Sequence, residues 1–155
     1  MITAVDTNIL LDILIPNQPH LKSSLQKLEK ASKKGKIIIC EIVYAELASQ
    51  FDNLSDLNAF LTDTHIEIVW NSKESLFTTS RIWIEYHVQH SKKRFCPECG
   101  KQINAACPLC GSRLNIPRRI LNDFIVGTHA QTFADTFLTR DRGFYRKNFS
   151  DVTLY

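Results

Sequence analysis

Four acidic residues stand at points where an α/β sheet would gather them. Asp6 directly follows the apolar segment 2–5, and Asp141 follows a later apolar segment after one intervening residue. Glu46 and Asp123 lie one to two turns into predicted helices. Ligands of open parallel sheets bind outside the carboxyl ends of the strands. We therefore expect these four carboxylates to lie close together at that edge.

Carboxylates that converge repel one another and lose hydration energy unless a cation neutralises them. Oxygen ligands of this kind suit Mg²⁺ or Mn²⁺. A divalent ion held in this way activates a water molecule and stabilises the leaving oxygen in phosphodiester hydrolysis. Taken singly, each acid is also compatible with a turn, a helix cap or a solvated helix surface. The grouping of the four, rather than any one of them, predicts metal-dependent chemistry.

The helix expected to carry Asp123 combines an apolar face with a stripe of small residues. Asp123 is aligned with Gly127, Ala130 and Ala134. Small side chains let a helix approach its neighbour closely, so we expect the stripe to bring Asp123 to the sheet edge. His129 lies on the opposite side of this helix and is expected to be structural.

Four of the five cysteines form two Cys-x-x-Cys-Gly pairs within fifteen residues: Cys96, Cys99, Cys107 and Cys110. Four thiolates at this spacing predict a closed, tetrahedral, structural zinc site, a zinc ribbon. Rubredoxin-type iron uses similar pairs, but with a much longer connection. The segment is too small to build a core, so the metal must fold it. The remaining cysteine, Cys40, ends an apolar run and is expected to be a buried, inert thiol.

The cysteine segment is strongly basic. Between positions 91 and 119, seven basic residues stand against one acid, a local net charge of +6 in a chain whose total is +3. The basic residues are Lys92, Lys93, Arg94, Lys101, Arg113, Arg118 and Arg119. This layout is typical of a lobe that grips a polyanion such as RNA. The alternatives are a basic surface that only improves solubility and a metal-folded loop that does not contact RNA.

The elements that must position these residues alternate between short apolar strands and helices. Strands are expected at 2–5, 36–40, 65–70, 136–139 and near 152–154. Helices are expected after position 8 and over 20–34, 42–51, from 55, 74–90 and from 118 to 134, and a turn over 141–143. This alternation predicts an α/β domain with a mainly parallel sheet. The cysteine segment interrupts it, which predicts a discontinuous main domain (1–90 and 115–155) and an inserted module (91–114).

Length and composition agree with one compact domain. The chain has 155 residues, of which 44% are hydrophobic and 23% charged. These values exclude a disordered or fibrous protein. No apolar run approaches the length of a membrane helix, and the N-terminus lacks the features of a signal peptide. We therefore expect a cytoplasmic protein with no membrane partner.

Four blocks of the sequence together resemble the PIN-domain ribonuclease family. They are AVDTNIL (4–10), VYAEL (43–47), NDFIVGTHA (122–130) and FLTRDRGF (137–144). They occur in the order of the family, whose body would cover about 1–90 and 115–155. The resemblance implies a three-layer α/β/α fold and metal-dependent cleavage of RNA. The inserted cysteine segment is a departure, because compact PIN toxins connect these helices by a short link.

The resemblance also implies roles for individual residues. Asp6, Glu46, Asp123 and Asp141 would form the acidic quartet, with Asp6 and Asp123 as the main ligands of Mg²⁺ or Mn²⁺. Asn8 and Thr139 would be secondary polar contacts near the pocket. Three further acids match no functional position and are expected to be surface or cap residues: Asp12, Glu41 and Asp135.

Several biological roles stay open for such a chain. The first is an endoribonuclease in RNA processing, maturation or decay, with RNA and a ribosomal precursor as partners. A toxin of a toxin–antitoxin pair, with an antitoxin partner, uses the same chemistry. Family members often dimerise, so a homodimer is a further expectation. A non-catalytic RNA- or protein-binding scaffold is the alternative from another class, and an iron-containing electron-transfer module is a weaker one.

Overall fold

The computed structural model describes residues 1–15, 19–90, 98, 101, 109–112 and 121–155. These residues form a four-stranded sheet in which every strand pair is parallel. The strands are β1 (Ile2–Val5), β2 (Lys36–Ile39), β3 (Ile66–Ile68) and β4 (Thr136–Leu138), in the order β3-β2-β1-β4. The predicted parallel α/β architecture is therefore confirmed. Strand β1 is central and pairs with β2 on one side and β4 on the other.

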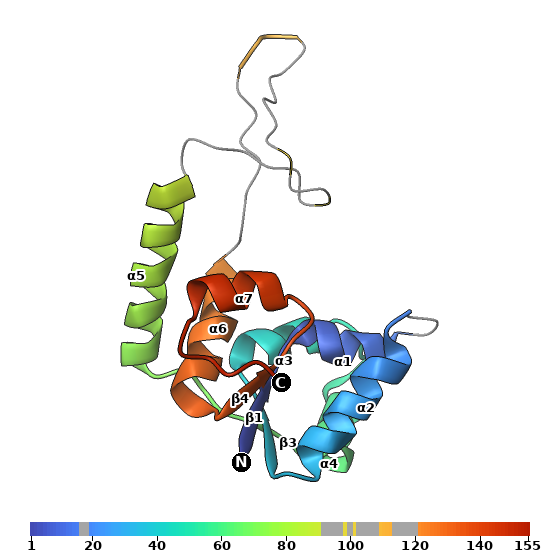
Figure 1. Ribbon diagram of the computed structural model, residues 1–155. Coiled ribbons are helices and arrows are strands. Elements are labelled where there is room, and N and C mark those ends of the chain that lie inside the picture. The colour runs from blue at the N-terminus through green and yellow to red at the C-terminus, as the bar shows by residue number, and fades with distance from the viewer. Residues whose placement is uncertain (16–18, 91–97, 99–100, 102–108, 113–120) are drawn as a thin grey trace.

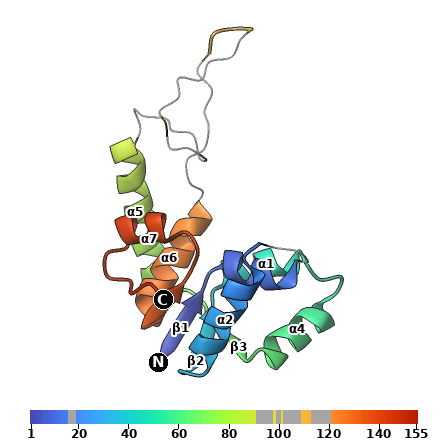
Figure 2. The same cartoon turned by 45° about the vertical axis from the view of Figure 1, so that its right-hand side comes forward.

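Helices cover the sheet on two sides. They are α1 (Thr7–Leu14), α2 (Leu21–Ser32), α3 (Glu41–Ala48), α4 (Leu54–Asp63), α5 (Lys73–His90), α6 (Leu121–Phe133) and α7 (Arg142–Asn148). Helices α5 and α6 lie on one side of the strands, whereas α1 and α2 lie on the other (Figures 1 and 2). Residues before and after the segment 91–120 thus contribute to a single sheet.

The sheet core is built from short, branched side chains. In β2, Ile37, Ile38 and Ile39 are each no more than 2% exposed. β-branched residues suit a pleated strand that is covered on both faces. Neighbouring β1 contributes Ala4 and Val5, which are equally buried. Burial on both faces explains why these strands read as continuous apolar runs rather than as alternating patterns.

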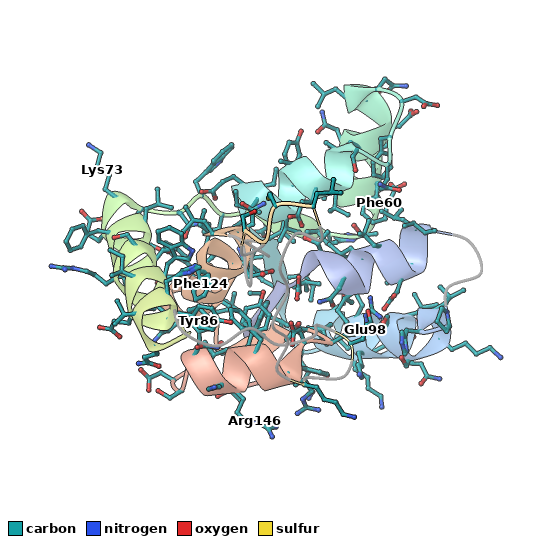
Figure 3. The ribbon with its side chains drawn as sticks, turned by 90° about the horizontal axis from the view of Figure 1, so that it is seen from above. Phe60, Lys73, Tyr86, Glu98, Phe124 and Arg146 are labelled. Atoms are coloured by element: carbon teal, nitrogen blue, oxygen red, sulfur yellow. The ribbon has the colours of Figure 1, made fainter. Side chains whose placement is uncertain are left out.

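Aromatic side chains pack α5 against the rest of the domain. Tyr86 of α5 and Phe124 of α6 lie in the space between the two helices, as Figure 3 shows, with ring centroids 5.2 Å apart. Phe144 of α7 meets Phe124 edge-on, also at 5.2 Å. Such edge-to-face pairs add to the stabilisation from burial. This cluster holds the first turn of α6 next to α7, and both helices begin beside the carboxyl ends of the strands.

The C-terminal region differs from the expectation in two respects. The expected turn at 141–143 is the start of helix α7, because the Asp141 side chain accepts a hydrogen bond from the Phe144 backbone N–H and caps the helix. The expected final strand is reduced to an isolated parallel bridge between Phe137 and Leu154. Two hydrogen bonds form this bridge: the Phe137 N–H donates to the Thr153 carbonyl at 2.8 Å, and the Tyr155 N–H donates to the Phe137 carbonyl at 2.9 Å.

Most of the cysteine segment lies outside the described residues. The zinc site of Cys96, Cys99, Cys107 and Cys110, and the extent of the module over 91–114, therefore remain predictions. Cys110 is described and is exposed, with its Sγ 3.0 Å from the Ser112 hydroxyl. Among the described helices, none is both long enough and apolar enough to cross a membrane.

Candidate active site

The carboxyl end of β1 passes directly into α1, and Asp6 occupies the junction. Its backbone N–H donates to the Leu138 carbonyl at 3.0 Å, which ties the junction to the end of β4. The extended backbone of Asp6 precedes the first turn of α1. The side chain therefore projects beyond the sheet edge while the residue stays only 8% exposed. This is where a ligand of a parallel sheet would bind.

Two polar side chains meet the same oxygen of Asp6. The Thr139 hydroxyl donates to Asp6 Oδ2 at 2.6 Å, and the Asn8 amide donates to it at 2.5 Å. Thr139 Oγ1 in turn accepts the backbone N–H of Asp141 at 3.0 Å. The structure thus brings Asn8 and Thr139, the two residues proposed as secondary contacts, directly against Asp6.

Glu46 is held by two residues that the sequence patterns did not single out. The Thr7 hydroxyl donates to Glu46 Oε2, and the Asn122 amide lies 3.4 Å from Glu46 Oε1. These three residues come from α1, α3 and α6. Thr7 and Asn122 each adjoin a quartet acid, Asp6 and Asp123, in the sequence. That adjacency was the signal that could have identified them.

Burial makes Asp6 an unusual carboxyl group. Removal from water is the largest cause that raises its pKa, from 3.8 to about 6. The negative charges of Asp123 and Glu46 raise it further, whereas hydrogen bonds from the Thr139 side chain and from the Asn8 backbone lower it. The site therefore stores negative charge that is only partly compensated by hydrogen bonds. A positive charge brought to this edge would favour the ionised form of Asp6.

The other two quartet acids occupy different positions around Asp6. Asp123 is half-buried in the first turn of α6, close enough to Asp6 to affect its ionisation. Asp141 caps α7, with its Oδ1 3.3 Å from the Phe144 N–H, and is linked to Asp6 through the Thr139 hydroxyl. Asp6, Glu46 and Asp123 thus interact through their charges, while Asp141 adjoins them by hydrogen bonding.

Gly127, in the small-residue stripe of α6, lies in close contact with the C-terminal segment. A Cβ at Gly127 would lie 2.5 Å from the Phe149 ring, so the close approach is to the aromatic residue after α7. Phe149 is 1% exposed and has little room to move. Gly127 thus fixes α6 against the C-terminal segment, while the helix also packs against β1 of the sheet.

One acid expected at the surface is buried instead. Asp12 is 1% exposed, and its Oδ2 accepts the Ser24 hydroxyl at 2.6 Å and lies 3.1 Å from Arg140 Nε. The expectation of a surface or cap residue was wrong because a positive partner distant in sequence compensates the charge. Asp135 does fit that expectation, since it is exposed and accepts the Ile2 N–H at 2.7 Å. Glu41 begins α3 and accepts the Asn71 N–H at 3.2 Å.

Two further residues behave as structural groups. His129 is 1% exposed, and its Nε2 lies 2.8 Å from the Val69 carbonyl oxygen. Burial lowers the pKa of His129, which favours the neutral ring. Cys40 is 1% exposed, and burial raises the pKa of its thiol to about 11. Both expectations, a structural histidine and an inert buried thiol, are confirmed.

Of the seven basic residues predicted to bind RNA, Lys101 alone belongs to the described residues, and it is exposed. The other six lie outside them: Lys92, Lys93, Arg94, Arg113, Arg118 and Arg119. Their contact with RNA remains a prediction. Within the described residues, basic side chains also occur beside the site itself, at Arg140 and at Arg142.

The donor chemistry of the site fits a hard divalent cation. Within the part of the chain that the structure describes, no three His, Cys, Asp or Glu side chains are grouped closely enough to hold a metal ion as they stand. The oxygens of Asp6 and Glu46 face hydrogen-bond donors instead. Nevertheless, the carboxylates could offer a metal ion only oxygen ligands, and Asp6 has a raised pKa next to two further acids. Mg²⁺ and Mn²⁺ prefer such ligands.

The fold and its acidic edge define an α/β protein with a parallel sheet and carboxylates at the carboxyl ends of its strands. The PIN domain family model matches residues 3–150, so the chain belongs to the PIN domain family. PIN domains are generally metal-dependent nucleases that use Mg²⁺ or Mn²⁺. A comparison of the sequence with curated proteins gives no significant match.

Solved structures of similar fold include three complexes. VapBC2 from Rickettsia felis, bound to a DNA fragment from its promoter, has a TM-score of 0.61 and 23% identity over 100% of this chain and 98% of that one. VapBC-1 from nontypeable Haemophilus influenzae has a TM-score of 0.60 and 15% identity, over 100% of this chain and 97% of that one. FitAB bound to the IR36 DNA fragment has a TM-score of 0.54 and 18% identity, over 100% of this chain and 94% of that one. At these identities the likeness concerns the fold.

Proposed function

We propose that the protein is a Mg²⁺- or Mn²⁺-dependent endoribonuclease that hydrolyses phosphodiester bonds at the acidic edge of the sheet. The single observation that carries this proposal is Asp6, buried at the end of the central strand beside Asp123 and Glu46, with a pKa of about 6. A protein that served only as a scaffold would gain stability from replacing such a group, because buried carboxylates that are only partly compensated are costly. Their presence together favours catalysis over the scaffold alternative.

Each residue of the site has a proposed task. Asp6 and Asp123 are the main cation ligands, and Glu46 and Asp141 support the ligands and the attacking water. When bound, the cation supplies a more acidic water and a positive charge for the leaving oxygen. Thr139 and Asn8 orient Asp6 through Oδ2, and Thr7 and Asn122 orient Glu46. Side chains locked in this way preorganise the ligands.

Within this chemistry, the solved structures of similar fold favour the toxin role. The three complexes described above belong to VapBC and FitAB proteins. We infer that an antitoxin is the partner of this chain and that RNA is its substrate. Expression of the protein alone should then arrest growth, and expression of the Asp6→Asn variant should not. Growth unaffected by an active nuclease would favour the role in RNA processing, with a ribosomal precursor as partner.

The inserted segment has a proposed role of its own. Structural Zn²⁺ held by Cys96, Cys99, Cys107 and Cys110 would fold it, and the seven basic residues in and next to it would bind the RNA backbone. Replacement of Lys92, Lys93 and Arg94 by glutamine should then weaken RNA binding and flatten its salt dependence. A homodimer is compatible with the proposal but is not required by it.

The proposal is tested by incubating the protein with a pool of structured and single-stranded RNAs. Separate reactions contain Mn²⁺, Mg²⁺ or EDTA, each with a parallel reaction of the Asp6→Asn variant. We expect cleavage that requires the cation and is lost in the variant. RNA that is bound but never cut, with or without the cation, would contradict the nuclease and favour the scaffold.

A further inference from the structure

A salt bridge next to the acidic edge has no place in the proposed hydrolysis. It joins Arg140, directly after β4, to Asp12 of α1, with Nε 3.1 Å from Oδ2. The two ends of the bridge differ in their surroundings. The Asp12 side chain is 2% exposed, whereas the Arg140 side chain is 40% exposed. The positive group thus faces solvent while its partner is fixed inside the protein.

Arg140 is bound to the site by its backbone as well. Its N–H donates to Asn8 Oδ1 at 3.1 Å, and the Asn8 amide donates to Asp6. The preceding residue, Thr139, donates to the same oxygen of Asp6. Asn8 and Asp12 are four residues apart in α1 and therefore lie on one face, about one helical turn from each other. The guanidinium is therefore held about one turn along α1 from the acidic edge.

Stability alone is a weak reason for this arrangement. A buried carboxylate paired with a half-exposed arginine contributes little net stabilisation, since the loss of hydration offsets much of the attraction. What the pair does provide is a fixed position, because Ser24 and Arg140 both bind Oδ2 of Asp12. A planar guanidinium in a fixed position binds phosphate oxygens well, often through two hydrogen bonds.

We propose that Arg140, positioned by Asp12, binds the phosphate adjacent to the one that is cleaved. This inference rests on the proposed nuclease function and names a contact of that site with its substrate. The acids at the edge repel the phosphodiester backbone, and a cation bound there would attract one phosphate. Arg140 supplies a permanent positive charge for the neighbouring phosphate and fixes the direction in which the strand crosses the sheet edge.

The test measures binding of a fluorescein-labelled oligouridylate by fluorescence anisotropy over a series of NaCl concentrations. All proteins carry Asp6→Asn and are kept in Mg²⁺, so that the strand is bound but not cut. Arg140→Gln should weaken binding about tenfold, as expected for loss of one charged hydrogen-bonding contact. It should also lower the slope of log affinity against log salt by about 0.7, the value for one phosphate contact of a single strand.

Two further variants separate binding from folding. Arg140→Gln leaves Asp12 buried without its partner, so the double variant Asp12→Asn/Arg140→Gln removes both charges and retains polar groups at both positions. It should bind as weakly as Arg140→Gln. Arg81→Gln on α5 removes one exposed arginine, whose guanidinium lies over the Phe77 ring, and should leave binding unchanged.

The outcomes distinguish this inference from the proposed function. If both Arg140 variants bind with the affinity and salt slope of their parent, Arg140 is not a phosphate contact and the inference is wrong, whatever the nuclease does. If the Asp6→Asn parent cleaves the oligouridylate, or binds no RNA, the proposed function is contradicted and this inference with it. An equal loss of affinity in Arg81→Gln would also contradict a specific contact.

Discussion

The Thr139 hydroxyl donates a 2.6 Å hydrogen bond to Asp6 Oδ2 and joins the ends of two adjacent parallel strands. Because Thr139 Oγ1 also accepts the Asp141 N–H, a single hydroxyl connects two acids of the site. The bond lowers the pKa of Asp6 and so partly opposes the effect of burial. Thr139 therefore helps to keep Asp6 ionised, which a cation ligand must be.

Removal of this hydroxyl should weaken the site without unfolding the protein. In Thr139→Val, we expect the pKa of Asp6 to rise and cleavage to fall about tenfold at neutral pH, as is typical when a group that orients a metal ligand is lost. The pH profile of cleavage should shift to higher pH. The matched control is Thr136→Val at the start of β4, whose hydroxyl pairs with that of Thr3. Equal rates for Thr139→Val and the wild-type protein would argue against this role.

The stability of the metal-free protein should depend on pH through Asp6. The pKa of Asp6 is about 6 in the folded protein and has its ordinary value of 3.8 in the unfolded chain. Between these two pH values the folded protein therefore binds a proton that the unfolded chain has released. The contribution of Asp6 to stability is therefore greatest below pH 4 and decreases as the pH rises through 6, by about 3 kcal/mol in total. Asp6→Asn lacks this charge and should be the more stable protein at pH 7.5.

Urea unfolding in EDTA at pH 4 and at pH 7.5 measures this difference. The two proteins should have similar stability at pH 4, and the variant should gain its advantage only at the higher pH. Mg²⁺ at pH 7.5 should stabilise the wild-type protein more than the variant, because it binds the folded state through Asp6. A constant difference between the two proteins at both pH values would contradict the raised pKa.

Replacement of glycine by alanine should have opposite effects on stability at two positions. Gly127→Ala places a methyl group 2.5 Å from the buried Phe149 ring and should destabilise the protein by about 1–3 kcal/mol. A methyl group added at Gly143, within α7, would meet no other atom within 4 Å, so Gly143→Ala should stabilise by about 0.5–1 kcal/mol. Urea unfolding of both variants measures these values. A stabilised Gly127→Ala protein would show that Phe149 does not confine this helix.

The cysteine segment should carry one structural zinc ion per chain. Elemental analysis of the purified protein should give about one equivalent of zinc, because four thiolates form a closed tetrahedral site. Cys99→Ser should lose most of it. Less than about half an equivalent of zinc, or stoichiometric iron with visible absorbance, would contradict the zinc ribbon.

The sequence predicted the strands well and the last elements less well. The runs 2–5 and 36–40 are apolar and β-branched, and burial on both faces made them recognisable. Helix α7 was missed because its start depends on the cap that Asp141 forms with the Phe144 N–H, and Asp141 had been interpreted as a turn residue. The last predicted strand is only a bridge, since Leu154 pairs at a single position.

The candidate site was predictable to a similar degree. Asp6, Asn8 and Thr139, which the resemblance placed near one pocket, are joined by hydrogen bonds, because the ends of β1 and β4 are adjacent in a parallel sheet. The burial of Asp12 was not predictable, since its partner Arg140 is distant in sequence and no local pattern marks an ion pair of this kind. The roles of Thr7 and Asn122 depend on contacts between helices, although their positions next to Asp6 and Asp123 in the sequence could have indicated them.

The central claim is that the carboxylates at the sheet edge, and no other acids, carry out RNA cleavage. The most direct test compares the cleavage rates of Asp123→Asn and Asp135→Asn in Mn²⁺ under single-turnover conditions. Asp123 lies beside Asp6, whereas Asp135 binds the Ile2 N–H at the opposite end of β1. The account predicts no cleavage by Asp123→Asn and the wild-type rate for Asp135→Asn. Cleavage by Asp123→Asn at the wild-type rate would contradict it.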